Sequence, residues 1–114
     1  MNDIERATFD LSHIPGVRGA MVVDVQAGVP VTAELATGVQ GPAIAAFASA
    51  LFRRSAQAIR SAGYGALATV QLQAGGGDVV VVGNDVLLVV VLAEPDAQLG
   101  LIRVQAQNVA EELA

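Results

Sequence analysis

The chain of 114 residues contains no cysteine, no lysine and no tryptophan, and His13 is its only histidine. The absence of cysteine excludes disulfides, thiolate metal ligands and cysteine nucleophiles. The absence of lysine excludes a Walker-type phosphate-binding loop and Schiff-base chemistry. A single histidine leaves few ways to build a catalytic triad or a zinc centre. Together these absences favour a non-enzymatic domain that works through its surfaces.

Long hydrophobic runs are also missing, although 54% of the residues are hydrophobic and only 15% are charged. The most apolar stretch, residues 79–93, is broken at residues 83–85 into runs of four and eight, far shorter than the roughly twenty residues that a membrane helix needs. The N-terminal segment is charged and lacks the apolar core of a signal peptide. We therefore expect a single domain over residues 1–114 that is cytoplasmic, does not insert into membranes and has enough apolar material for one core.

Negative charge predominates, and it is unevenly distributed along the chain. The net charge is −5, which argues against nucleic acid as a partner because phosphate binding requires clustered cations. Residues 35–77, however, contain three arginines and no acidic residue, while the rest of the chain carries three arginines and all eleven acidic residues. This segregation predicts one electropositive surface on an acidic body.

The spacing of apolar residues and of turn signals predicts eight secondary-structure elements. They are a helix over residues 3–14, strands over 19–25 and 29–35, a helix over 42–62, strands over 66–73, 78–82 and 86–93, and a helix over 96–113. The last two strands are continuous apolar runs, which indicates that both of their faces are covered. All links between consecutive strands are short, so the sheet should be mainly antiparallel. The predicted fold is α+β, a three-layer α/β/α sandwich with a five-stranded sheet in the order α-β-β-α-β-β-β-α.

Three features that could carry chemistry are better explained by structure. His13 follows Asp10 at helical spacing, but a catalytic pair would also need a positioned nucleophile, so we interpret His13 as a surface or helix-end residue. The glycines at 75–77 precede a strand rather than a helix, which favours a hairpin loop over a phosphate cradle. The carboxylates at the strand ends match no calcium or magnesium loop. We therefore expect no catalytic residue, no metal and no cofactor.

The helix predicted over residues 42–62 has an unusual outer surface. A plain solvent-facing helix usually mixes acidic and basic residues, whereas this one carries three arginines, no acid and several alanines. Small residues allow another helix to approach closely, and arginine is enriched at interfaces. The alternative is an ordinary helix of an alanine-rich protein. We predict a partner-binding surface formed by Ala46, Ala50, Arg53, Arg54, Gln57 and Arg60.

The strand predicted over residues 66–73 adds a second interaction surface. Its residues alternate between two sides: Leu67, Thr69, Gln71 and Gln73 fall on one, which is almost entirely uncharged and polar, and Ala68, Val70 and Leu72 fall on the other. Neither proline nor charge protects the strand from pairing at a sheet edge. Together with the neighbouring helix, this predicts a homodimer in which one sheet continues across a two-fold axis. The expected dimer interface comprises Phe47, Leu51, Arg54, Ala58, Thr69, Gln71 and Gln73.

A succession of short motifs resembles a known family. The motifs are IPGVRGA at 14–20, MVVD at 21–24, GVPV at 28–31, the alanine-rich central helix, LLVVVL at 87–92 and LGLIR at 99–103. In this order, from about Ile4 to Leu113, they resemble the roadblock/dynein-light-chain family. The resemblance implies a roadblock/profilin-like fold that dimerises through the central helix and the third strand into a ten-stranded sheet. It also implies a non-catalytic platform for small GTPases or motor complexes.

Within that family the chain resembles bacterial members of the MglB type, which bind a Ras-like small GTPase and promote its GTP hydrolysis. The resemblance implies that the GTPase docks across the paired central helices. An activator can work by ordering the switch loops of the GTPase, and the alternative is that Arg53, Arg54 or Arg60 acts as an arginine finger. Two other hypotheses stay open. The chain could be a structural homo- or heterodimerisation subunit of a larger assembly, or a small-molecule sensor.

Overall fold

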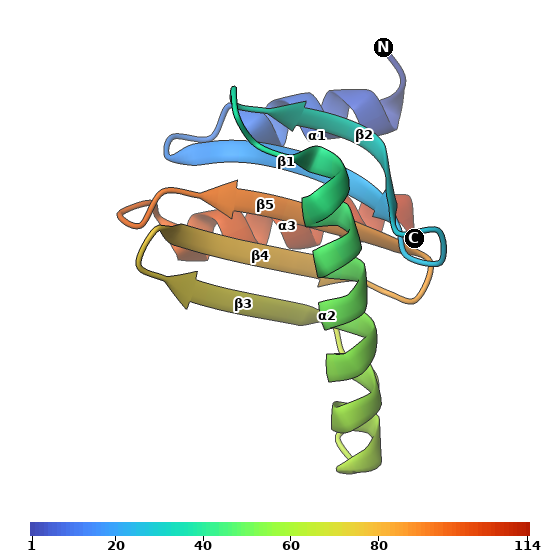
Figure 1. Ribbon diagram of the computed structural model, residues 1–114. Coiled ribbons are helices and arrows are strands. Elements are labelled where there is room, and N and C mark those ends of the chain that lie inside the picture. Colours follow the sequence, from blue (N-terminus) through green and yellow to red (C-terminus); the bar gives the residue numbers. More distant parts are fainter.

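The computed structural model describes all 114 residues and contains three helices and five strands (Figure 1). In chain order the elements are α1 (Asp3–Ser12), β1 (Val17–Asp24), β2 (Val29–Leu35), α2 (Gly41–Ser61), β3 (Thr69–Ala74), β4 (Gly77–Gly83), β5 (Leu87–Ala93) and α3 (Leu99–Leu113). This order confirms the prediction.

Two elements begin three residues later than the sequence predicts. Before α3, the backbone N–H of Ala97 donates to the carbonyl of Glu94 at 3.0 Å, so this segment forms a turn instead of a first helical turn. The ladder of β3 begins with Thr69 opposite Val82, and β4 ends one residue later at Gly83. Residues 66 and 67 therefore lie beyond the end of the partner strand.

The five strands form one sheet in the order β2-β1-β5-β4-β3, and every neighbouring pair is antiparallel. The most apolar strand, β5, lies in the middle. The two edges are β2 and β3, and α2 is the element that connects them. The chain must therefore cross the whole sheet between these edges, and α2 makes that crossing on one face (Figure 1).

The three helices form the two outer layers that the sequence predicts. On one face α1 packs on β1 and β2, and α3 packs on β4 and β5. On the other face α2 lies alone and makes its main contacts with β2, β1 and β5. The expectation that helices cover both faces of the sheet thus holds on the side of α1 and α3. On the α2 side it holds for Val81 of β4, which is buried in the core beneath α2, but it fails over β3 and over Val79 of β4. One helix is too narrow to cover five strands.

The limits of α2 follow from its flanking residues. Pro42 occupies the first turn, where its missing N–H would have no helical partner in any case. Gly63, just past the C-cap, adopts a φ of +85°, which glycine reaches without steric cost. Between these residues the helix is long enough that its C-terminal half extends past the edge strand β3 (Figure 1). None of the three helices combines the length and hydrophobicity that crossing a bilayer requires.

Candidate partner and dimer surfaces

One side of α2 is buried against the sheet. Ala45, Ala48, Phe52 and Ala56 are buried at intervals of three or four residues and join the core of β1, β4 and β5 residues on this face. Ser49 is also buried, and its hydroxyl has no hydrogen-bond partner. The two sides of the helix that flank this buried stripe remain accessible. They are chemically different, and they contact different parts of the sheet.

The first flank, called the arginine flank here, faces the turns at one end of the sheet. Its residues recur every three or four positions, and all are exposed except the half-buried Ala50: Ala46, Ala50, Arg53, Gln57 and Arg60. These are five of the six residues predicted to bind a partner. Arg54 is also exposed, but it lies about 100° around the helix from Arg53 and belongs to the other flank.

A hollow of about 520 Å³ lies beside the arginine flank. Arg53, Gln57 and Arg60 form its helical wall. Gln26, from the turn after β1, and Asp85, from the turn between β4 and β5, line it from the sheet side. The sequence did not indicate that Asp85 or Gln26 would lie near the arginines, because these turns are far from α2 along the chain.

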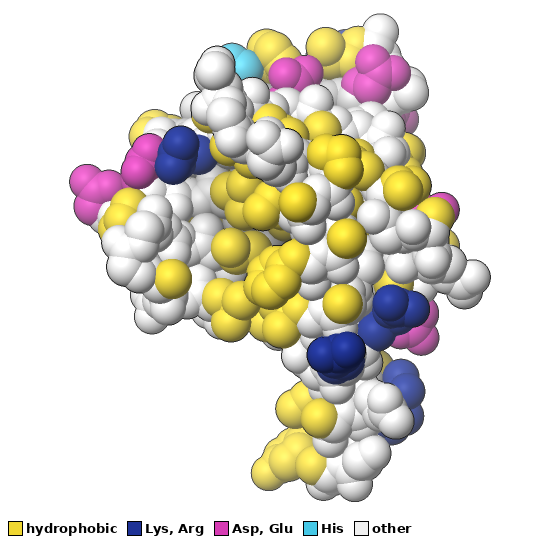
Figure 2. All heavy atoms as spheres, in the orientation of Figure 1, with side chains coloured by type: hydrophobic (Ala, Val, Ile, Leu, Met, Phe, Trp, Pro, Cys, Tyr) yellow, Lys and Arg dark blue, Asp and Glu magenta, His cyan; other side chains and the backbone are white.

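The second flank of α2 faces the part of the sheet that the helix leaves open. Phe47 is 48% exposed, and Leu51 is half-buried beside it. Hydrophobic side chains gather next to α2 over β4 and β3 in Figure 2. The half-buried apolar residues of this sheet surface are Val70 and Leu72 of β3, Val79 of β4 and Leu92 of β5, which the register places on one face. With Phe47 and Leu51 they form what we call the apolar patch.

Sequence reasoning missed the four sheet residues of the apolar patch. The alternation of β3 correctly placed Val70 and Leu72 on one face. The sequence did not show that α2 leaves this face uncovered, so neither residue was predicted to lie at an interface. The open outer edge of β3, which pairs only with β4, lies next to this patch. An unpaired edge with an apolar surface beside it is suited to association with another chain.

The predicted dimer residues fall on two faces of the molecule. Phe47, Leu51, Arg54 and Ala58 lie on the second flank of α2, and all except Leu51 are exposed. Thr69, Gln71 and Gln73 instead point toward the layer of α3. They lie opposite Val82, Val80 and Asp78, and the Nε2 of Gln107 on α3 donates to the Thr69 hydroxyl at 3.3 Å. The residues on α2 and those on β3 therefore lie on opposite faces of the sheet, and the outer edge of β3 lies between them.

His13 makes local contacts at the end of α1. Its Nδ1 lies 2.8 Å from the carbonyl oxygen of Phe9, and its ring packs on the Phe9 ring with centroids 4.2 Å apart. The Ser12 hydroxyl is 3.1 Å from Nδ1, but it also donates to the Phe9 carbonyl at 2.6 Å. Asp10 is not among the partners of the imidazole. The arrangement matches the helix-end interpretation of His13.

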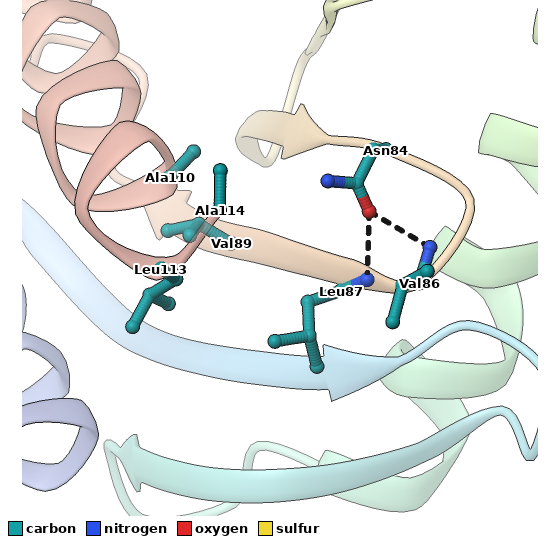
Figure 3. A pocket seen from close by; sticks show the side chains of 7 residues that line it. All are labelled: Asn84, Val86, Leu87, Val89, Ala110, Leu113 and Ala114. Atoms are coloured by element: carbon teal, nitrogen blue, oxygen red, sulfur yellow. Dashed lines mark hydrogen bonds between the residues drawn. The ribbon is translucent and has the colours of Figure 1, made fainter.

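A small apolar pocket of about 220 Å³ lies between α3 and the turn that joins β4 to β5 (Figure 3). Its lining is apolar except for Asn84. The Asn84 Oδ1 accepts hydrogen bonds from the backbone N–H groups of Val86 and Leu87, at 2.8 and 3.1 Å, and so serves the turn. Specific small-molecule sites usually combine an apolar lining with several polar groups that orient the ligand. This pocket offers no such set, which does not favour the sensor hypothesis.

Comparison with known proteins places this geometry in a known fold. No family model matches the sequence. Two uncharacterized proteins of Methanocaldococcus jannaschii are 28% and 27% identical over 110 residues, which cover 96% of this chain and 96% of each relative. The Roadblock/LC7 domain from Streptomyces avermitilis superimposes with a TM-score of 0.85 at 17% identity, over 98% of this chain and 95% of that one. The chain has the roadblock fold.

Other solved structures agree with this assignment. Myxococcus xanthus MglB gives a TM-score of 0.88 at 13% identity, over 99% of this chain and 93% of that one. The gliding protein MglB from Thermus thermophilus gives 0.78 at 14% identity, over 98% and 94%. The roadblock resemblance inferred from the short motifs is thus confirmed, and so is the α+β fold class. In the roadblock fold of this chain, the arginine flank and the apolar patch lie on opposite sides of α2.

Proposed function

We propose that this roadblock-fold protein is a dimeric, non-catalytic regulator or scaffold that binds a Ras-like small GTPase. The proposal rests on the fold shared with MglB together with one observation, the two accessible flanks of α2. The apolar patch and the open edge of β3 would form the contact with a second copy. The arginine flank would then remain accessible on each protomer and would face the GTPase.

The small side chains on the arginine flank support a protein partner. Ala46 and Ala50 project little from the helix, so the backbone of another element can approach closely. Arginines follow on the same flank, and none of them is neutralised by an acidic residue of α2, which contains no Asp or Glu. An apolar, closely approachable surface next to cations is typical of protein interfaces rather than of a solvated helix.

The test is binding to the Ras-like GTPase of the same genome whose gene lies nearest, loaded with GDP or with a GTP analogue and measured by calorimetry. We expect the wild-type protein to bind and the Ala46→Arg, Ala50→Arg double variant to lose binding, because two long side chains would block close approach. The control is Gln105→Arg with Asn108→Arg, which adds the same charge to exposed positions of α3 on the opposite face.

Three outcomes can be distinguished. Binding by the wild type and by the α3 control, but not by the Ala46→Arg, Ala50→Arg variant, supports the proposal. Equal binding by both double variants would show that the GTPase docks elsewhere. A wild-type protein that dimerises but binds no GTPase in either nucleotide state would instead favour the alternative of a structural dimerisation subunit.

A further inference from the structure

The hollow beside the arginine flank carries two cations without an ionic partner. Arg53 and Arg60 line it, and Asp85 lies across from them. The only salt bridge within the chain joins Arg18 to Glu94 at 3.5 Å, so neither arginine pairs with Asp85. Figure 2 shows basic side chains gathered on the lower half of α2 with an acidic side chain beside them. A concave surface with uncompensated guanidinium groups is suited to anionic ligands.

The spacing of the two arginines restricts the ligand. They are seven residues apart on the same side of α2, which corresponds to about 10 Å along the helix axis. Each guanidinium can hold a carboxylate through two parallel hydrogen bonds. Two carboxylates separated by about 10 Å occur on a helix whose acidic residues are themselves seven positions apart. Gln57 lies between the arginines and can donate a further hydrogen bond to the backbone or a side chain of such a segment.

Asp85 argues against a polyphosphate ligand. Its carboxylate lines the same hollow and would repel a run of phosphates, and the net charge of the chain is −5. A protein segment can instead satisfy both signs, because it can place a basic residue opposite Asp85 and acidic residues opposite the arginines. Such a pattern of charges also fixes the orientation in which a partner docks.

We propose that this hollow binds an acidic helical segment of a partner protein, with two carboxylates about 10 Å apart on Arg53 and Arg60 and a cation opposite Asp85. The inference rests on the proposed function, because it names the chemistry of the surface that the GTPase presents to the arginine flank. It adds Asp85 and Gln26 to that surface and requires that its occupant carry both signs of charge.

The first experiment follows the Nε–H signals of the arginines by NMR, which is practical because the chain contains only six arginines and no lysine. The probe is a helical peptide of about 15 residues with two glutamates seven positions apart and an arginine between them. A second peptide has glutamines in place of the glutamates. We expect the first peptide alone to shift Arg53 and Arg60, and the shifts to shrink as NaCl rises from about 50 to about 500 mM.

Arg54 and Arg103 serve as internal controls, because they lie on the other flank of α2 and on α3. Equal shifts of these two arginines would mean that the peptide binds the protein surface without specificity, which would overturn the inference. Absence of any shift at Arg53 and Arg60 would overturn it too. A short DNA duplex that shifts them more strongly than the peptide would identify phosphate as the ligand, against the proposal.

The second experiment separates this inference from the proposed function. The Arg53→Glu, Arg60→Glu double variant should bind the GTPase at least about tenfold more weakly than the wild type. The Arg6→Glu, Arg103→Glu double variant makes the same change of charge on α1 and α3, on the opposite face of the sheet, and should bind as the wild type does. Unchanged affinity in the double variant would overturn the inference and leave the GTPase function intact. A wild type that binds no GTPase, but whose Arg53 and Arg60 signals respond to the peptide, would reject the function and support the acidic-segment site.

Discussion

Phe47 and Phe52 lie five residues apart on α2 and have opposite surroundings. Phe52 is 1% exposed and packs in the core of the α2 face, while Phe47 is 48% exposed at the border of the apolar patch. At the scale of single residues, burial therefore separates the side chains that stabilise the fold from those available to a partner. The same separation applies along α2 to Ala56, which is buried, and Ala58, which is exposed.

The two phenylalanines give the first prediction. Phe52→Ala should lower the free energy of unfolding by about 3–5 kcal/mol, because it removes a buried aromatic ring and leaves a cavity. Phe47→Ala should leave the stability of the isolated protomer nearly unchanged but weaken self-association. Urea denaturation of dilute protein and sedimentation equilibrium measure the two effects. Similar losses of stability in both variants would contradict the assignment of Phe47 to an interface.

The strands at the two edges of the sheet differ in what covers them. On the α2 face, the helix lies over β2 but leaves β3 and the adjoining part of β4 largely open. On the opposite face, Thr69 is held by Gln107 of α3. At the scale of elements, β3 thus presents an apolar face, a polar face and an unpaired edge, and the apolar face is the one beside the second flank of α2.

The second prediction compares the two edge strands. Leu72→Arg, in the apolar patch, should convert the dimer to a monomer, because it buries a charge without a partner in the interface. Val31→Arg makes the same kind of change at a residue of β2 that is 50% exposed, and should leave the dimer intact. Light scattering coupled to size exclusion gives the masses, 11.6 kDa for the protomer and twice that for the dimer. If the wild type had the mass of a single protomer at high micromolar concentration, dimerisation would be refuted.

The distribution of charge gives the whole molecule two unlike surfaces. All eleven acidic residues lie outside residues 35–77, and the three arginines inside that segment are all on α2. Since α2 stands alone on its face of the sheet, these cations gather on one side of the molecule. A dimer formed through the apolar patch would bring two such helices together and double the basic surface available to a partner.

The third prediction concerns thermal unfolding of the whole molecule. Dimerisation links folding to association, so the Tm should rise with protein concentration, by roughly 5 °C over a hundredfold range. The monomeric Leu72→Arg variant should have a Tm that does not depend on concentration. Calorimetry at several concentrations tests both expectations. A constant Tm for the wild type would show that association does not contribute to its stability.

Local signals were sufficient for most of the chain. Pro42 and Gly63 mark the two ends of α2 where the sequence predicted them. The alternation in β3 correctly placed Val70 and Leu72 on one face and Thr69 and Gln71 on the other. Asp24 accepts hydrogen bonds from the backbone N–H groups of two residues in the turn after β1, as expected for a carboxylate at a strand end. Each of these features depends on residues close together in the chain, which is why periodicity and turn chemistry predict them.

Features that depend on distant segments were not predictable in the same way. The order of strands confirms that β3 is an edge, as its lack of proline and charge had indicated. The path of α2, however, decides which strands the helix covers, and that path does not follow from local spacing. The hollow was not predictable either. Asp85 lines it together with Arg53 and Arg60 because the turn between β4 and β5 lies beside α2.

Propensity, periodicity and composition act locally, so they were enough to predict the eight elements, the fold class and a basic, alanine-rich helix on an acidic protein. The folded arrangement was needed to show that one flank of this helix borders an open apolar sheet surface and that the other faces a carboxylate across a hollow. A single helix covers only part of a five-stranded sheet, and what it leaves uncovered depends on where the folded chain places it.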